Sequence, residues 1–268
     1  MIYAPKIRQL GECHLSADAP IAVFDSGAGG IGVLREVQKV LPAERLFYFG
    51  DTANAPYGEK SDAKIRRLAL LHGERLLKNA KALLIACNTA TALAAAPLRA
   101  RHPDRLIVGM EPAIFPALAV TAHPRVLVLV TAATERSEKF RALLRRAEKK
   151  ANMTAVAAPD IVPLVEAGLA DSPEMERSLR ALLTPHLSPP PDAVVLGCTH
   201  FPFAARAISR VTGGVPLFDG AAGTARHLAK LLSEAGLIST KFGRGEVTLT
   251  SSDPTALPLY RRLFEKGE

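Results

Sequence analysis

Short apolar runs rich in β-branched residues alternate along the chain with segments whose apolar residues recur every three or four positions. The first pattern is typical of buried strands and the second of amphipathic helices. Ile31, Leu34, Val37 and Leu41, for example, follow helical spacing. We expect strands in the apolar runs 21–25, 45–51, 82–87, 105–111, 125–131, 193–198, 215–219 and 246–250.

The alternation of strands and helices predicts an α/β fold with mostly parallel sheets. The sequence also contains a weak internal repeat. "LLIACNTA" (83–90) is similar to "VVLGCTHF" (194–201), and "AVFDSG" (22–27) is similar to "PLFDG" (216–220). We therefore expect two pseudo-symmetric, doubly wound α/β domains, with the active site in the crevice between them.

Prolines mark where the chain is expected to pass between these domains. Pro112 and Pro116 interrupt the segment that follows the fourth apolar run, and proline disfavours a continuous helix or strand. The expected parts are an N-terminal extension (1–20), a first α/β domain (21–112 plus 214–268) and a second α/β domain (113–213).

The composition is that of a globular protein. The 268 residues are 48% hydrophobic, which is enough apolar material for two cores. Cys13, Cys87 and Cys198 are too few for a disulfide framework, which favours a reducing compartment. We expect a soluble cytoplasmic protein without a membrane partner, because no stretch has the length and apolarity of a signal or a membrane span.

The chain carries 34 Lys and Arg against 26 Asp and Glu, a net charge of +8, which raises the question of nucleic-acid binding. The densest basic cluster, residues 138–150, places Phe140, Leu143, Leu144 and Ala147 at helical spacing. Its Arg and Lys side chains therefore fall mainly on the outer face of a helix. No nucleic-acid-binding motif accompanies them, and we expect no nucleic-acid partner.

Two of the cysteines have matching surroundings. Cys87 and Cys198 each close an apolar run and precede residues able to begin a helix, where free N–H groups stabilise an anion. A helix N-terminus or a neighbouring His can lower a thiol pKa from about 8.5, so either side chain could act as a base near neutral pH. A buried structural role is the alternative for each cysteine alone. Cys13 lacks this context and receives no role.

Other polar residues stand beside these strand ends. His200 lies two residues after Cys198, and Asp25 and Ser26 end the first apolar run. Asp25 taken alone is equally well explained as a cap or a turn residue. The segment "SGAGG" (26–30) matches neither the dinucleotide fingerprint nor the phosphate-loop pattern. Its glycines are expected to allow a close backbone approach and a tight turn.

Taken together, the motifs resemble those of the glutamate racemases, in the same order along the chain. The resemblance extends from about residue 21 to at least residue 235. Its segments are "FDSGAGGIGVLREV" (24–37), "YFGDTANAPYGEK" (48–60), "ACNTAT" (86–91), "EPA" (111–113), "VPLVEAG" (162–168) and "GCTHFP" (197–202). Residues 126–140 lack a glycine-containing threonine motif found in the family, so substrate contacts from this segment are expected to differ.

The resemblance implies a cofactor-independent isomerase that interconverts L- and D-glutamate and supplies D-glutamate for peptidoglycan and cell shape. It implies that Cys87 and Cys198 exchange protons with the α-carbon from opposite faces. It further implies that Asp25 assists Cys87, and that Glu166 and His200 assist Cys198. No cofactor or metal is implied, no lysine has a recognisable pyridoxal context, and dimers occur in the family.

The resemblance also implies a set of substrate-binding residues, which would hold the carboxylates and the ammonium group through side chains and backbone N–H groups. Turn or cap formation is the alternative for the Ser, Asn and Thr members. The set consists of Asp25, Ser26, Pro56, Tyr57, Gly58, Asn88, Thr89, Thr199 and His200.

Three other functions compete with this prediction. A related racemase acting on aspartate or a hydantoin would use the same paired thiols. A thiol redox sensor would join Cys87 and Cys198 in a disulfide. A zinc-binding module is disfavoured, because Cys-x-His occurs without four ligands at the usual spacings.

Overall fold

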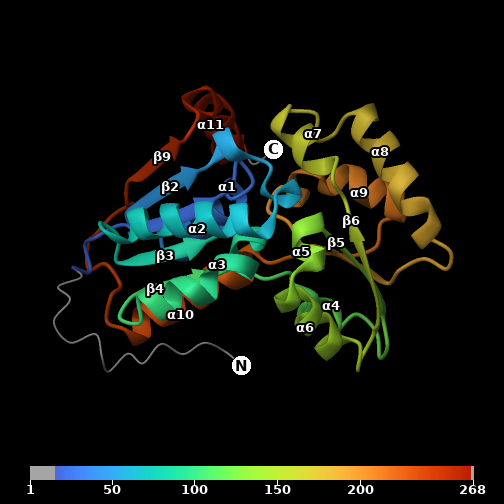
Figure 1. Ribbon diagram of the computed structural model, residues 1–268, viewed down its shortest axis with the longest axis horizontal. Helices are drawn as coiled ribbons and strands as arrows, with labels where there is room; N and C mark the ends of the chain where they lie inside the picture. The colour runs from blue at the N-terminus through green and yellow to red at the C-terminus, as the bar shows by residue number, and fades with distance from the viewer. Residues whose placement is uncertain (1–15, 267–268) are drawn as a thin grey trace.

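The structure, a computed structural model, describes residues 16–266, which form two α/β lobes side by side (Figure 1). Cys13 and residues 1–15 of the expected N-terminal extension lie outside the described residues. Within residues 16–266, no helix is both long and apolar enough to cross a membrane. The division into two α/β domains confirms the predicted fold class.

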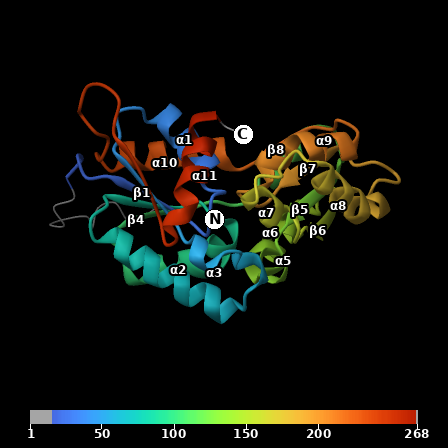
Figure 2. The same ribbon diagram turned by 90° about the horizontal axis from the view of Figure 1, so that it is seen from above.

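The first sheet has the strand order β4-β3-β1-β2-β9, and all of its strand pairs are parallel. Helices α2 and α3 cover one face, and α1, α10 and α11 cover the other (Figure 2). The strands are β1 (Ile21–Asp25), β2 (Leu46–Gly50), β3 (Ala82–Ile85), β4 (Leu106–Gly109) and β9 (Val247–Ser251). The helices are α1 (Ile31–Val40), α2 (Asp62–Leu77), α3 (Asn88–Arg101), α10 (Ala221–Glu234) and α11 (Leu257–Lys266).

Burial on both faces explains why these strands are continuous apolar runs. In β1, Ile21 and Val23 pack in the core beneath α1 and α10, whereas Ala22 and Phe24 pack in the core beneath α2 and α3. Successive side chains of a strand point to opposite faces, so a sheet covered twice requires apolar residues at every position.

The second sheet has the strand order β6-β5-β7-β8, again with parallel pairs throughout. Helices α7, α8 and α9 line one face and α4 and α6 the other, while α5 contacts α3 of the first lobe. The strands are β5 (Arg125–Val130), β6 (Asn152–Ala157), β7 (Ala193–Leu196) and β8 (Leu217–Asp219). The helices are α4 (Ile114–Ala117), α5 (Ala132–Arg136), α6 (Glu138–Ala147), α7 (Ile161–Glu166), α8 (Pro173–Leu183) and α9 (Ala205–Thr212).

Two features of the second sheet differ from the sequence prediction. Strand β6 was not predicted, because only Val156 of its six residues is buried and no continuous apolar run marks this edge strand. The boundary at residue 214 was set too early. Strand β8 pairs with β7, with Phe218 opposite Val195, so the chain returns to the first lobe only with α10.

Helix α6 confirms the interpretation of the basic cluster. Phe140, Leu143 and Ala147 are buried, and Arg145 and Arg146 are exposed. The hydrophobic stripe therefore anchors the helix to the second sheet, and the basic residues form its solvated face.

Candidate active site

Strand ends of both lobes meet at the interface between them. Asp25 ends β1, Cys87 follows β3, and Cys198 follows β7 of the other lobe. Their side chains are almost inaccessible, with exposed fractions of 0%, 5% and 8%. Thr199 Oγ1, next to Cys198, donates a hydrogen bond across the interface to Asp25 Oδ2 at 3.0 Å. The fold thus joins residues far apart in the sequence in one buried site.

Cys87 caps the N-terminus of α3, as the sequence predicted. Its Sγ accepts a hydrogen bond from the Ala90 N–H at 3.4 Å and lies 3.5 Å from Ser26 Oγ. Burial, reinforced by the nearby Asp25 carboxylate, nevertheless raises the pKa of Cys87 to about 12. In the structure described, the position of Cys87 at a helix N-terminus therefore does not outweigh the effect of its burial on the pKa.

Cys198 does not cap a helix, because the 3-10 helix η5 (Phe201–Ala204) begins only three residues later. The polar partner of its sulfur is instead a histidine. His200 turns back so that its Nδ1 lies 3.9 Å from Cys198 Sγ. Glu166 Oε1 lies 2.7 Å from His200 Nε2 and accepts a hydrogen bond from the Ala28 N–H at 2.8 Å. The Gly29 N–H donates to the same His200 nitrogen at 3.2 Å. Cys198, His200 and Glu166 therefore form a continuous polar chain.

The charges in this chain follow from its contacts. Burial alone would lower the pKa of His200, but hydrogen bonds with Cys198 and Glu166 outweigh it and raise the pKa to about 10. Burial favours the neutral form of Glu166, yet its contacts with His200 leave its pKa below the usual range. The raised pKa of His200 and the lowered pKa of Glu166 both favour an imidazolium paired with a carboxylate.

The Asp25 carboxyl group interacts electrostatically both with His200 and with Cys87. Burial raises its pKa to about 6, although the His200 cation, the Gly27 N–H and the Thr199 hydroxyl all favour the carboxylate. A carboxyl group with a pKa near neutrality can both accept and release a proton under physiological conditions.

The glycines of "SGAGG" let the first lobe approach this chain closely. A Cβ on Gly27 would lie 2.4 Å from Glu166 Oε1, and one on Gly29 would lie 2.5 Å from His200 Nδ1. Any side chain at these positions would displace the polar groups of the second lobe. The prediction that these glycines permit a close backbone approach is confirmed.

Hydroxyl groups of both lobes meet beside Cys87. Thr89 Oγ1 lies 2.9 Å from Thr131 Oγ1 and 3.2 Å from Thr134 Oγ1. Thr131 and Thr134 belong to the segment that departs from the family pattern, and they were not predicted as site residues. A signal was present, because Thr131 closes its apolar run just as Cys87 and Cys198 close theirs.

Asn88 differs from its neighbours because its amide has no partner. The residue is 3% exposed, and neither Oδ1 nor Nδ2 forms a hydrogen bond within the described part of the chain. A buried amide without partners is costly unless a ligand satisfies it. Asn88 therefore suits the predicted role of a substrate-binding side chain.

The loop that contains Pro56, Tyr57 and Gly58 also reaches the interface. Tyr57 is buried, and its hydroxyl donates a hydrogen bond to Asp51 Oδ2 at 2.7 Å. This hydrogen bond lies within the first lobe, between the loop and the end of β2. A Cβ on Gly58 would lie 2.7 Å from Thr131 Cβ of the other lobe. Substrate binding by the backbone N–H groups of Tyr57 and Gly58 stays a prediction.

A buried thiol from each lobe, each beside an ionisable side chain, is an arrangement suited to acid–base chemistry on a substrate held between the lobes. The comparison with known proteins points the same way. The family described as Asp/Glu/Hydantoin racemase matches residues 31–228. The chain belongs to this family, and it is an isomerase.

Individual relatives cover nearly the whole chain. Glutamate racemase from Ectopseudomonas mendocina is 45% identical over 227 residues, which cover 84% of this chain and 86% of that protein. The crystal structure of glutamate racemase from Francisella tularensis in complex with D-glutamate has a TM-score of 0.82 at 27% identity, covering 92% and 94% of the two chains. That of the Thermus thermophilus glutamate racemase, in complex with β-chloro-D-alanine, has a TM-score of 0.76 at 37% identity, covering 93% of both.

Proposed function

We propose that the protein interconverts L- and D-glutamate, with Cys87 and Cys198 as the two acid–base groups. The observation that carries this proposal is the placement of one buried thiol from each lobe at a shared interface, with Asp25 beside Cys87 and His200 beside Cys198. The substrate assignment is supported by relatives named glutamate racemase, one of which was crystallised with D-glutamate.

The proposed reaction moves two protons at one carbon. The thiolate of one cysteine removes the α-proton, and the electron pair of the broken C–H bond stays on the α-carbon. The thiol of the other cysteine then gives its proton to the opposite face, which forms the new C–H bond and inverts the configuration. In the reverse direction the two sulfur atoms exchange roles.

The neighbours of each sulfur restore its protonation state. The imidazolium of His200, held by Glu166, supplies or takes back the proton of Cys198. Asp25, with a pKa of about 6, accepts the proton of Cys87, because Cys87 must lose this proton before it acts as a base. Buried proton carriers of this kind are suited to a reaction whose α-proton is a very weak acid.

The substrate cage consists of the polar groups around the thiols. The unpartnered amide of Asn88 and the hydroxyls of Ser26, Thr89 and Thr199 hold the carboxylates and the ammonium group. Fixed donors near the α-carbon stabilise the charge that develops when the proton leaves. The backbone N–H groups of Tyr57 and Gly58 complete the cage.

The cellular role proposed is the supply of D-glutamate for peptidoglycan. The protein acts in the cytoplasm, where reducing conditions keep Cys87 and Cys198 as free thiols, the form in which both occur in the structure. Expression in a bacterium that requires added D-glutamate tests this role. Growth without the supplement supports it, and continued dependence on the supplement contradicts it.

The substrate is tested by incubation with L-glutamate or D-glutamate, without added cofactor, followed by chiral chromatography. We expect both reactions to end at equal amounts of the two enantiomers, because enantiomers have equal free energies. Aspartate and a 5-substituted hydantoin serve as competing substrates, and we expect little conversion of either. Faster conversion of one of them would reassign the substrate within the family.

The thiols are tested by Cys87→Ser and Cys198→Ser. Because a serine hydroxyl is a much weaker acid than a thiol, each change should lower the racemisation rate by roughly 10²-fold to 10⁴-fold or more. Cys13→Ser, outside the described residues, is the control and should leave the rate unchanged. Circular dichroism shows whether each variant folds. Near-normal racemisation by either active-site variant would remove the two-thiol assignment.

A further inference from the structure

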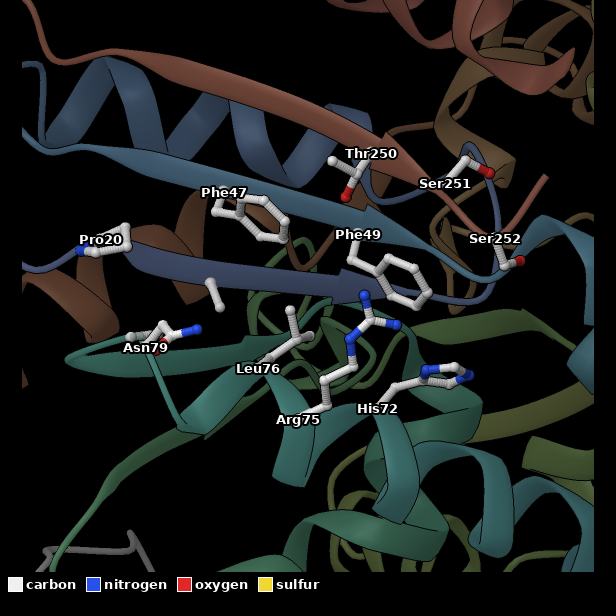
Figure 3. A pocket seen from close by; sticks show the side chains of 12 residues that line it. Pro20, Phe47, Phe49, His72, Arg75, Leu76, Asn79, Thr250, Ser251 and Ser252 are labelled. Carbon is white, nitrogen blue, oxygen red and sulfur yellow. The ribbon is translucent and has the colours of Figure 1, made fainter. Parts of the chain in front are cut away.

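A cavity lies in the first lobe, away from the thiols. On the face of the first sheet covered by α2 and α3, α2 packs on β1 and β3 and leaves part of β2 and β9 uncovered. The resulting cavity has a volume of about 500 Å³ (Figure 3), within the range of small-molecule sites. Its lining consists of Pro20, Ala22, Phe47, Phe49, His72, Arg75, Leu76, Asn79, Ala80, Thr250, Ser251 and Ser252.

The walls of this cavity favour a flat apolar group. Phe47 and Phe49 are two residues apart on β2, so both rings stand on the same face of the sheet. Leu76 of α2 closes the opposite side, as Figure 3 shows. Aromatic and aliphatic side chains facing one another across a narrow space are well suited to bury a planar ring.

One cation, the solvent-exposed Arg75, lines the cavity and has no acidic partner within residues 16–266. The guanidinium of Arg75 extends from α2 toward the ring of Phe49 (Figure 3), with Cζ 5.9 Å from the ring centroid. Arg101 and Arg136 pair with Glu74 and Asp62, respectively, but no carboxylate in the described part of the chain pairs with Arg75. Nor does any acidic side chain of residues 16–266 line the cavity. A ligand carboxylate can therefore pair with this guanidinium.

The end wall of the cavity is held in place by a buried contact. The ring of His72 lies 4.8 Å from that of Phe49, and its Nε2 is 3.2 Å from Asp51 Oδ2. None of the proposed catalytic residues lines this cavity, so it is separate from the site between the lobes.

We propose that this cavity binds a planar aromatic carboxylate, with its ring against Phe47 and Phe49 and its carboxylate on the Arg75 guanidinium. The proposal does not depend on the substrate of the racemase site. It rests on the pairing of an apolar, ring-lined cavity with a single unpaired cation.

The probe for this site is 1-naphthoate, and 1-naphthamide is an uncharged molecule of nearly the same shape. Isothermal titration calorimetry should give a Kd of about 1 mM or lower for 1-naphthoate. The amide should bind about tenfold more weakly, because it lacks the charge that pairs with Arg75. Saturating D-glutamate should not displace the probe.

The matched variants are Arg75→Gln and Arg66→Gln, which remove the same charge from the same helix. Arg66 lies about half a turn from Arg75 around the axis of α2 and does not line the cavity. Arg75→Gln should weaken binding about tenfold, and Arg66→Gln should leave it unchanged. No binding, equal loss in both variants, or displacement by D-glutamate would overturn the proposal. Since the measurement follows binding without turnover, such a failure leaves the proposed racemisation untouched.

Discussion

Asp25 combines complete burial with a pKa of about 6, well above the value of about 3.9 for an unfolded chain. The folded protein therefore holds this proton more tightly than the unfolded chain does. The stabilising effect is fully present below about pH 4 and is lost as the pH rises through about 6. At neutral pH, the ionised carboxylate costs the fold about 3 kcal/mol.

Asp25→Asn should therefore stabilise the protein at pH 7.5 while lowering its racemisation rate. We expect the free energy of unfolding to rise by up to about 3 kcal/mol, and the difference from wild type to vanish near pH 4. Urea unfolding at the two pH values measures both quantities. A variant less stable than wild type at pH 7.5 would show that the ionised Asp25 carboxylate does not destabilise the folded protein.

Asn88 is a second residue for which we expect different effects of substitution on stability and on substrate binding. Asn88→Ala removes an amide that has no partner in the described residues, so the free energy of unfolding should not fall. The affinity for glutamate should fall by about 10-fold to 100-fold, because a hydrogen bond to a charged ligand group is lost. Equilibrium binding and urea unfolding measure the two effects.

Thr91 is the matched control, one turn further along α3. Its Oγ1 donates a hydrogen bond to the Ile85 carbonyl at 3.1 Å. Thr91→Ala should lower the free energy of unfolding by about 1 kcal/mol and leave the affinity for glutamate unchanged. The opposite pattern in the two variants would assign Asn88 to the fold rather than to the substrate.

The sequence predicted the positions of the two buried thiols better than their electrostatic environment. Cys87 and Cys198 were predicted because each closes a buried strand, which is a local property. The pKa of Cys87 depends on Asp25, which the fold brings from another strand, and the state of His200 depends on Glu166. Such contacts between distant segments leave no pattern in a single sequence.

At the scale of elements, burial determined what was predictable. Strands β1, β3, β5 and β7, covered on both faces, produce continuous apolar runs and were all predicted. Strand β6 is an edge strand with one buried residue and was missed. The place of β8 in the second sheet was also missed, because apolarity reveals that a strand is buried but not which strand it pairs with.

The contact between η3 (Tyr57–Glu59) and the start of α5 joins the two lobes next to the site. Gly58→Ala places a methyl group 2.7 Å from Thr131 Cβ, so the loop and α5 must separate. We expect the racemisation rate to fall tenfold or more, because roughly 1 Å of misplacement costs up to about 10²-fold. Steady-state kinetics measures this loss.

Gly223→Ala in α10 is the matched control, because within residues 16–266 no atom beyond its two chain neighbours and the nearby backbone of α10 lies within 4 Å of the added methyl group. Alanine should raise the free energy of unfolding by about 0.5–1 kcal/mol relative to glycine inside a helix, and the rate should not change. Equal rates for Gly58→Ala and wild type would mean that this contact between the lobes is not required for catalysis.

At the scale of the whole molecule, hydrogen bonds between the lobes keep the site closed. Thr199 bonds Asp25, Ala28 bonds Glu166, and Thr89 lies 2.9 Å from Thr131. With both thiols nearly inaccessible, we expect the lobes to move apart when glutamate enters. In the proposed mechanism, the same closure excludes water, so that only the two sulfur atoms exchange protons with the substrate.

If two thiols act on opposite faces of the α-carbon, the hydrogen at the α-carbon of the product comes from the solvent and not from the substrate. In deuterated water, D-glutamate formed early from L-glutamate should carry deuterium at the α-carbon, since its new proton comes from the second thiol. The L-glutamate recovered at the same time should stay largely protiated. Mass spectrometry of the separated enantiomers at low conversion measures both, and the reverse reaction should mirror them. Early product that keeps the hydrogen of the substrate would contradict two opposed bases at Cys87 and Cys198.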